Sequence, residues 1–128
     1  MNVLLDTHFA IWSITERERL GAVEELIEDR ANRIVVSTVS VWEIAIKFAI
    51  GKSSAPGVSG WDALHEFEDI GFEILPVKGH HAAAVADLPA IHRDPFDRLL
   101  IAQATREGLS LVTRDKLLAQ YGKPVRLT

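Results

Sequence analysis

Residues 2–14, NVLLDTHFAIWSI, begin as an uninterrupted apolar run, reach one acid at Asp6 and continue as a segment of helical character. A short apolar run without alternation is typical of a strand buried on both of its faces. Such strands occur in parallel sheets that are covered by helices. The segment therefore predicts the first strand and the first helix of an α/β fold.

The rest of the chain repeats this alternation of strand and helix. Further strands are expected at RIVVS (33–37), FEILPV (72–77) and SLVT (110–113), and an apolar PVRL (124–127) closes the chain. Helices are expected at residues 20–30, 38–50, 61–71, 80–89, after residue 94, and at 115–122. We therefore predict a three-layer α/β/α domain around a central parallel sheet of about five strands. Pro76 indicates an edge strand or a strand end.

Composition limits the possible functions. The 128 residues are 48% hydrophobic and 25% charged, which suits a single domain over residues 1–128. The sequence has no apolar run of membrane-spanning length and no leader pattern, so we expect a cytoplasmic protein without membrane contact. The chain has no cysteine, so a metal would need oxygen or imidazole ligands, which favours Mg²⁺ or Mn²⁺. A net charge of −4 disfavours a general nucleic-acid coat but permits a local basic rim.

Carboxylates are expected at the carboxyl ends of the strands, where ligands bind in parallel α/β sheets. Asp6 follows the first strand, and Asp115 follows SLVT. Glu43 and Asp97 lie on helices that begin near the same edge. Four carboxylates from distant parts of the chain should thus converge, and they would repel one another unless a cation neutralises them or some of them protonate.

Some of these acids also have simpler explanations. Asp6 and Asp115 each precede a predicted helix and could serve as N-caps. Glu43 could form an ion pair with Lys47 one turn later on a solvent-facing stripe, although its apolar neighbours leave little room for such a stripe. On position alone, these structural alternatives stay open.

The dipeptide Asp94-Pro95 has the sequence of a helix N-cap followed by a first-turn proline. It places Asp97 at the third helical residue. From there the carboxylate can turn back to the cap or point beyond the helix end, and both orientations stay open. The KSSAPGVSG segment (52–60) is expected to be a mobile loop.

Four motifs together resemble the PIN-domain ribonucleases, specifically the VapC-type toxins of bacterial type II toxin–antitoxin pairs. They are LLDTHFAIW near the start, TVSVWEIAIK (38–47) followed by Gly-Lys, HRDPFDRLLIAQA (92–104) and LVTRD (111–115). The resemblance runs from residue 3 to about residue 121. It implies a PIN-like fold and an endoribonuclease that uses Mg²⁺ or Mn²⁺ and leaves 5′-phosphate and 3′-hydroxyl ends.

The resemblance also implies roles for individual residues. Asp6, Asp97 and Asp115 would bind one or two divalent cations, and Glu43 would bind a cation or orient the attacking water. Thr113 and Asp94 would support these acids. Contacts to the RNA backbone are expected from Lys47, Arg98 and Arg114.

The resemblance further implies partners. A VapB-type antitoxin would cover the acidic cleft, and two copies of the chain would form a homodimer, for which residues 7–14 offer an apolar surface. The five histidines contain no H-x-x-x-H spacing, so none is assigned to the metal. Trp12, Trp42 and Trp61 could stack on bases, but Trp42 is expected in the core.

Three other functions compete with this interpretation. A phosphatase of the haloacid-dehalogenase kind needs a second aspartate two residues after the first, where this chain has His8. A phospho-receiver needs an acceptor aspartate at a mid-sheet strand, and RIVVS offers none. A catalytically silent PIN-like module that binds RNA or protein remains as the alternative, and retention of all four acids favours the nuclease.

Overall fold

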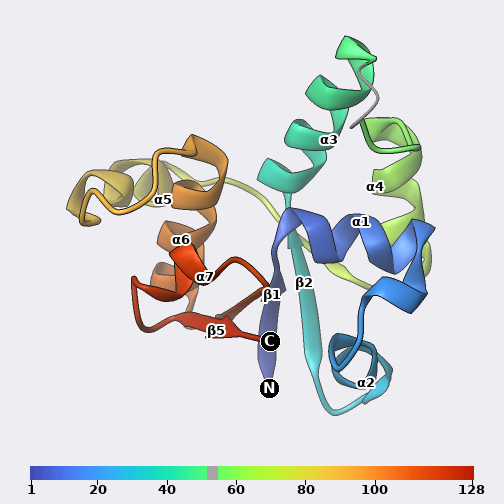
Figure 1. Cartoon of the computed structure of the whole chain (residues 1–128), viewed down its shortest axis with the longest axis horizontal. Coiled ribbons are helices and arrows are strands. Elements are labelled where there is room, and N and C mark those ends of the chain that lie inside the picture. The colour runs from blue at the N-terminus through green and yellow to red at the C-terminus, as the bar shows by residue number, and fades with distance from the viewer. Residues whose placement is uncertain (52–54) are drawn as a thin grey trace.

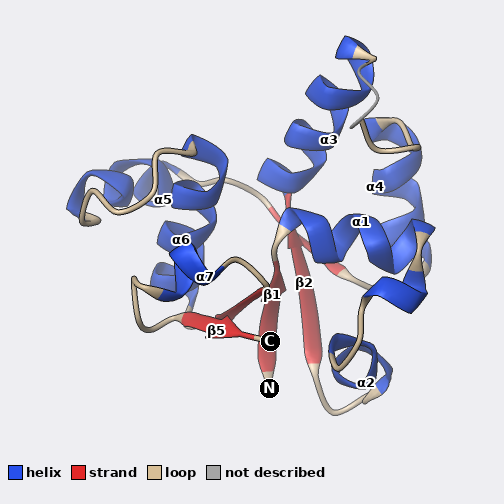
Figure 2. Ribbon diagram, viewed as in Figure 1, coloured by secondary structure: helices blue, strands red, loops and turns tan. Residues whose placement is uncertain are grey.

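The computed structural model describes residues 1–51 and 55–128, and within them a parallel sheet lies between two layers of helices (Figures 1 and 2). The strands run in the order β3-β2-β1-β4-β5. Their bounds are β1 Asn2–Leu5, β2 Arg33–Ser37, β3 Glu73–Leu75, β4 Ser110–Thr113 and β5 Val125–Leu127. The predicted α/β/α architecture with five strands is confirmed. The expected loop at 52–60 lies partly outside the described residues.

Helices cover both faces of the sheet. Figure 1 shows α1, α2 and α4 on one side and α5, α6 and α7 on the other, with α3 projecting from the carboxyl edge. Contacts tie α3 to α1, α4 and α6. The helix bounds are α1 Thr7–Thr15, α2 Val23–Glu28, α3 Thr38–Ile50, α4 Gly60–Asp69, α5 Gly79–Ala84, α6 Pro95–Glu107 and α7 Lys116–Ala119.

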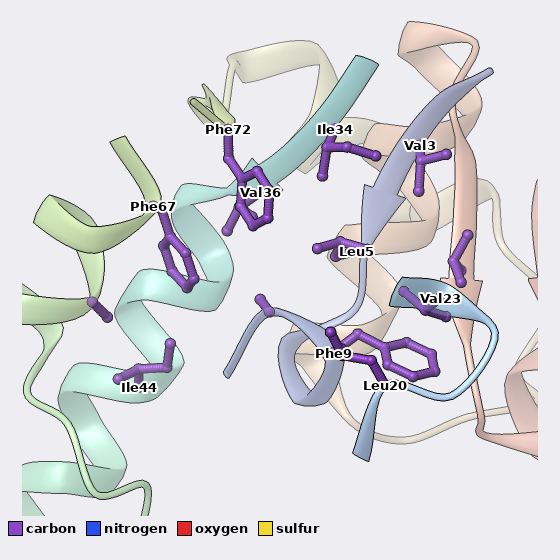
Figure 3. Close-up of a cluster of buried hydrophobic side chains, with 13 residues drawn as sticks. Val3, Leu5, Phe9, Leu20, Val23, Ile34, Val36, Ile44, Phe67 and Phe72 are labelled. Carbon is purple, nitrogen blue, oxygen red and sulfur yellow. The ribbon is translucent and has the colours of Figure 1, made fainter. Parts of the chain in front are cut away.

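Successive residues of the central strands point into two separate cores. Val3 and Leu5 pack with α1, α2 and α4 in the cluster that Figure 3 shows. Leu4, between them, packs in the other cluster with Leu100 of α6 and Leu118 of α7. All five side chains are almost completely buried. Burial on both faces explains why the strand sequence is continuously apolar.

Proline and glycine account for elements that are shorter than predicted. Gly21, with φ of +57°, separates a 3-10 helix at Arg17–Arg19 from α2, so the expected helix at 20–30 starts only at Val23. The expected helix at 80–89 becomes α5 followed by a 3-10 turn at Val85–Asp87, before Pro89. Strand β3 is an edge strand that ends just before Pro76, as predicted.

The structure places Trp42 outside the core and turns one face of α1 toward the core. Trp42 is 58% exposed, so its predicted core position is wrong: it lies on the outer side of α3, edge-on to Phe96 at 5.2 Å between ring centroids. Helix α1 faces inward, with Phe9 and Ala10 buried and Trp12 packed against the first core. Ile11, Trp12 and Ile14 are only half-buried, and the predicted homodimer stays a prediction.

All four strand pairings are parallel, so every strand ends at the same edge of the sheet. Helices α1, α3 and α7 begin at this edge, immediately after β1, β2 and β4. Among the described residues, none of the helices combines the length and apolar character needed to cross a lipid bilayer. The carboxyl edge is where the predicted acids meet.

Candidate active site

A cleft of about 700 Å³ opens at the carboxyl edge of the sheet, and three of the four predicted acids line it. Asp6 follows β1 and Asp115 follows β4, and these two strands pair directly, with Leu5 opposite Val112. Asp97 lies in the first turn of α6. The structure therefore brings together acids that are separated by about a hundred positions of sequence.

Asp6 serves both as a helix cap and as part of the cleft. Its Oδ1 accepts the backbone N–H of Phe9 at 2.9 Å, which caps α1, and its Oδ2 accepts the hydroxyl of Thr113 at 2.6 Å. The side chain is almost fully buried. Burial raises the pKa of Asp6, while these two hydrogen bonds oppose the rise. The predicted cap is thus confirmed, and the role of Asp6 as a metal ligand stays a prediction.

Thr113 links the acids of β1 and β4. Its fully buried hydroxyl donates to Asp6 and accepts the backbone N–H of Asp115 at 3.0 Å. Asp115 in turn caps α7, because its Oδ1 accepts the N–H of Leu117 at 2.8 Å. Its side chain is 40% exposed, and its Oδ2 faces the histidine described below.

Asp97 points away from the helix cap because Asp94 already occupies that position. Oδ1 of Asp94 accepts the backbone N–H groups of Phe96 at 2.8 Å and Asp97 at 3.4 Å, as its predicted supporting role requires. Burial, and then repulsion by Asp94, raise the pKa of Asp97 to about 7. Glu43 and Asp6 add to the repulsion, so all these carboxylates act on one another.

Glu43 is buried on α3 and is also paired with Lys47. Its Oε2 lies 2.5 Å from Nζ of Lys47, whose side chain is about half exposed and lines the cleft. The ion pair and the inward orientation were alternatives from sequence, and the structure contains both. The carboxylate does not line the cleft directly, but it is close enough to raise the pKa of Asp97.

His92 is a site residue that sequence reasoning missed. Its Nε2 lies 3.4 Å from Oδ2 of Asp97 and 3.3 Å from Oδ2 of Asp115. The three residues offer ligand atoms that all lie within 4.8 Å of one another. No spacing motif identifies His92, because it belongs to an irregular segment before α6 that reaches the acids through tertiary contacts.

The three arginines near the cleft have different surroundings. Arg114 lines the cleft, as does Arg19, and their guanidinium carbons lie 5.5 Å and 4.4 Å from the ring centroid of Trp12. These are cation–π distances. Arg98 instead donates to the carbonyl oxygens of Pro89 at 2.9 Å and of Val85 at 3.1 Å. Arg98 therefore binds backbone of its own fold and does not line the cleft, and its predicted contact with RNA stays a prediction.

The donor set fits a hard divalent cation. Carboxylates from three separate parts of the chain line the cleft. Burial is the main cause that raises the pKa of Asp6 and of Asp97, and repulsion by neighbouring carboxylates adds to both shifts. Mg²⁺ and Mn²⁺ prefer such oxygen ligands. Asp97 and Asp115 offer ligand atoms that lie within 4.8 Å of each other and of His92, and Asp6 lines the same cleft.

Comparisons with known proteins agree with this geometry. The family model of the PIN domain matches residues 3–124. Ribonuclease VapC22 of Mycobacterium tuberculosis is 33% identical over 134 residues, covering 98% of this chain and 96% of that protein.

Among solved structures, VapBC2 from Rickettsia felis bound to a promoter DNA fragment has a TM-score of 0.70 at 18% identity, covering 100% of this chain and 98% of that one. FitAcB from Neisseria gonorrhoeae has a TM-score of 0.65 at 20% identity, covering 98% and 96%. These structural similarities establish the same fold.

Proposed function

This chain belongs to the PIN domain family, and we propose that it is a divalent-metal-dependent endoribonuclease, the toxin of a type II toxin–antitoxin pair. The observation that carries the proposal is the convergence of Asp6, Asp97 and Asp115 on one cleft, with Thr113 tying two of them together. The relative that is 33% identical is a ribonuclease. We propose that the whole chain forms a single PIN domain.

Each acid has a defined part in the proposed reaction. A bound Mg²⁺ or Mn²⁺ would lower the pKa of a water molecule and stabilise charge on the scissile phosphate. Asp6, Asp97 and Asp115 would hold the cation, and Thr113 orients the first and last of these. Glu43, buried beside Lys47, would orient the attacking water or add a ligand. Cleavage would leave 5′-phosphate and 3′-hydroxyl ends.

The cleft also offers a path for a phosphate backbone. Lys47, Arg19 and Arg114 line it beside the acids, and Trp12 lies under the two guanidinium groups. Positive side chains bind phosphates, and an aromatic ring gives unpaired bases a surface for stacking. We propose that single-stranded RNA lies along this wall with one phosphate at the acids.

An antitoxin of the VapB type is the proposed protein partner. An apolar groove of about 540 Å³ runs between α3 and α4, and it includes Trp42, Phe48 and Trp61, of which Trp61 is 73% exposed. Contiguous exposed aromatic side chains mark interaction surfaces. VapBC and FitAcB are the subjects of the similar solved structures. A homodimer and action in the cytoplasm are further parts of the proposal.

The decisive experiment is cleavage of a mixed cellular RNA pool by antitoxin-free protein in Mg²⁺, Mn²⁺ or EDTA. Wild type is compared with Asp97→Asn and with Asp62→Asn, because Asp62 occupies the same third position of its helix α4 but is exposed and remote from the cleft. Discrete fragments that need metal and Asp97, but not Asp62, would support the nuclease. RNA binding without cleavage by the folded wild type would support the silent module instead.

A further inference from the structure

We infer that His92 is a positioning residue of the metal site: its Nε2–H group holds Asp97 and Asp115 at the separation that a shared cation requires, and the imidazole itself stays outside the coordination sphere. This inference rests on the proposed metal site. It adds to that site a residue that acts through the carboxylates.

The ring of His92 lies between two of the acids that line the cleft. His92 lies in the segment before α6, Asp97 lies in α6 and Asp115 caps α7. The imidazole therefore links the start of α6 to the start of α7. Its side chain is 15% exposed, and Nε2 is nearly equidistant from the two carboxylate oxygens, at 3.4 and 3.3 Å. One ring nitrogen therefore faces both acids at once.

A backbone contact of the other ring nitrogen determines the tautomer of His92. The other ring nitrogen, Nδ1, accepts the backbone N–H of Asp94 at 3.0 Å. A nitrogen that accepts an N–H carries no proton, so the neutral ring has its proton on Nε2. Because Nε2 has a proton and no free lone pair, it donates to Asp115, faces Oδ2 of Asp97 at 3.4 Å and does not ligate a cation.

Hydrogen bonds to Tyr121 and from Arg98 hold the backbone around His92 in place. Its backbone N–H donates to the hydroxyl of Tyr121 at 2.9 Å. Arg98 donates to the same hydroxyl at 3.1 Å and to the carbonyl of Pro89 at 2.9 Å. The segment before α6 is thus fixed from two sides, and Arg98 has a structural reason for its position next to Asp97.

The consequence is preorganisation of two acids in a cleft where negative charge accumulates. Asp94, Glu43 and Asp6 place further negative charge around Asp97. A donor between Asp97 and Asp115 keeps both carboxylates near the cleft before a cation arrives. Outer partners of this kind change metal affinity by roughly 10–100-fold when they are removed.

The experiment measures Mn²⁺ affinity by calorimetry, independently of RNA cleavage. We expect His92→Ala to weaken Mn²⁺ binding by about 10–100-fold. His92→Gln should restore part of the loss, because its side-chain amide can donate from about the same place. Tyr121→Phe should have a smaller effect in the same direction. His65→Ala, on the exposed surface of α4, is the matched control and should bind as wild type does.

Electron paramagnetic resonance of bound Mn²⁺ distinguishes positioning from ligation. We expect no nitrogen coupling from His92 in the wild type; a coupling that disappears in His92→Gln would overturn the inference in favour of direct ligation. Wild-type affinity in folded His92→Ala would overturn it as well. If His92→Ala fails to fold, His92→Phe, which keeps a ring but has no donor, takes its place, and wild-type affinity in that variant would overturn the inference. If the wild type binds no Mn²⁺ at all, the proposed metal site fails first.

Discussion

The hydroxyl of Thr113 donates a 2.6 Å hydrogen bond to Oδ2 of Asp6, although 107 positions separate the two residues. The same oxygen accepts the backbone N–H of Asp115. Thr113 has no exposed surface, so water cannot replace either contact. One hydroxyl therefore fixes the relative positions of two acids that come from opposite ends of the chain.

Thr113→Val should disturb both acids while keeping the shape of the side chain. The variant leaves a buried carboxylate oxygen and a backbone N–H without their partner, which should lower the free energy of unfolding by about 1–3 kcal/mol. Urea denaturation measures this loss. Thr113→Ser retains the hydroxyl and should lose less. Equal stability of Thr113→Val and wild type would contradict the role assigned to the hydroxyl.

Lys47→Met should lower the free energy of unfolding, because it leaves the buried carboxylate of Glu43 without its charged partner. The methionine keeps much of the apolar stem but removes the ammonium that lies 2.5 Å from Oε2. We expect the metal-free variant to lose about 1–3 kcal/mol of unfolding free energy, since a buried acceptor loses a charged donor. Thermal and urea unfolding in EDTA provide the measurement. Lys123→Met, at an exposed position, is the control and should stay near wild type.

The raised pKa of Asp97 makes the stability of the metal-free protein depend on pH, and it also sets the sign of that dependence. The ordinary pKa of 3.8 applies to the unfolded chain, and the folded value is about 7. Between these values the folded protein binds more protons than the unfolded chain, so this residue makes metal-free stability fall as pH rises from about 4 to about 7.

Asp97→Asn stays neutral at every pH and provides the comparison. We expect the variant to gain stability relative to wild type as pH rises through that window in EDTA. Thermal unfolding at a series of pH values measures the difference. A constant difference between the two proteins would show that the Asp97 carboxyl has an ordinary pKa.

Arg19 and Arg114 should contribute separately to the binding of RNA. Each contact with a phosphate adds roughly 0.7 to the slope of log affinity against log salt concentration for single strands. In an Asp97→Asn background that prevents cleavage, Arg19→Ala and Arg114→Ala should each weaken binding and flatten that slope by about this amount. Fluorescence anisotropy with a single-stranded RNA measures both. Arg30→Ala, an exposed arginine that does not line the cleft, should leave the slope unchanged.

Local rules predicted much of the fold. NVLL and RIVVS are apolar throughout because the sheet is covered on both faces, and Asp94-Pro95 begins α6 as capping rules require. Parallel strands then placed Asp6 and Asp115 at one edge without any further information. These features depend on residues that are neighbours in sequence or on a general property of parallel sheets.

The positions of His92, Arg98 and Trp42 depend instead on how segments distant in sequence pack together. His92 reaches Asp115 only because Tyr121 and Arg98 fix the segment before α6, and nothing near His92 in sequence indicates those contacts. Arg98 resembles a surface cation in sequence, yet its partners are carbonyl oxygens of that same segment. Trp42 has apolar neighbours but lies on the outward side of α3, since α3 extends past the sheet.

The pairing of β1 with β4 has a consequence for the synthesis of this protein. Asp6 is synthesised more than a hundred positions before Thr113 and Asp115. A nascent chain on the ribosome, or a fragment truncated before β4, has the first acid without the hydroxyl and carboxylate that complete the cleft. The order of translation thus separates the synthesis of the first acid from the completion of the cleft.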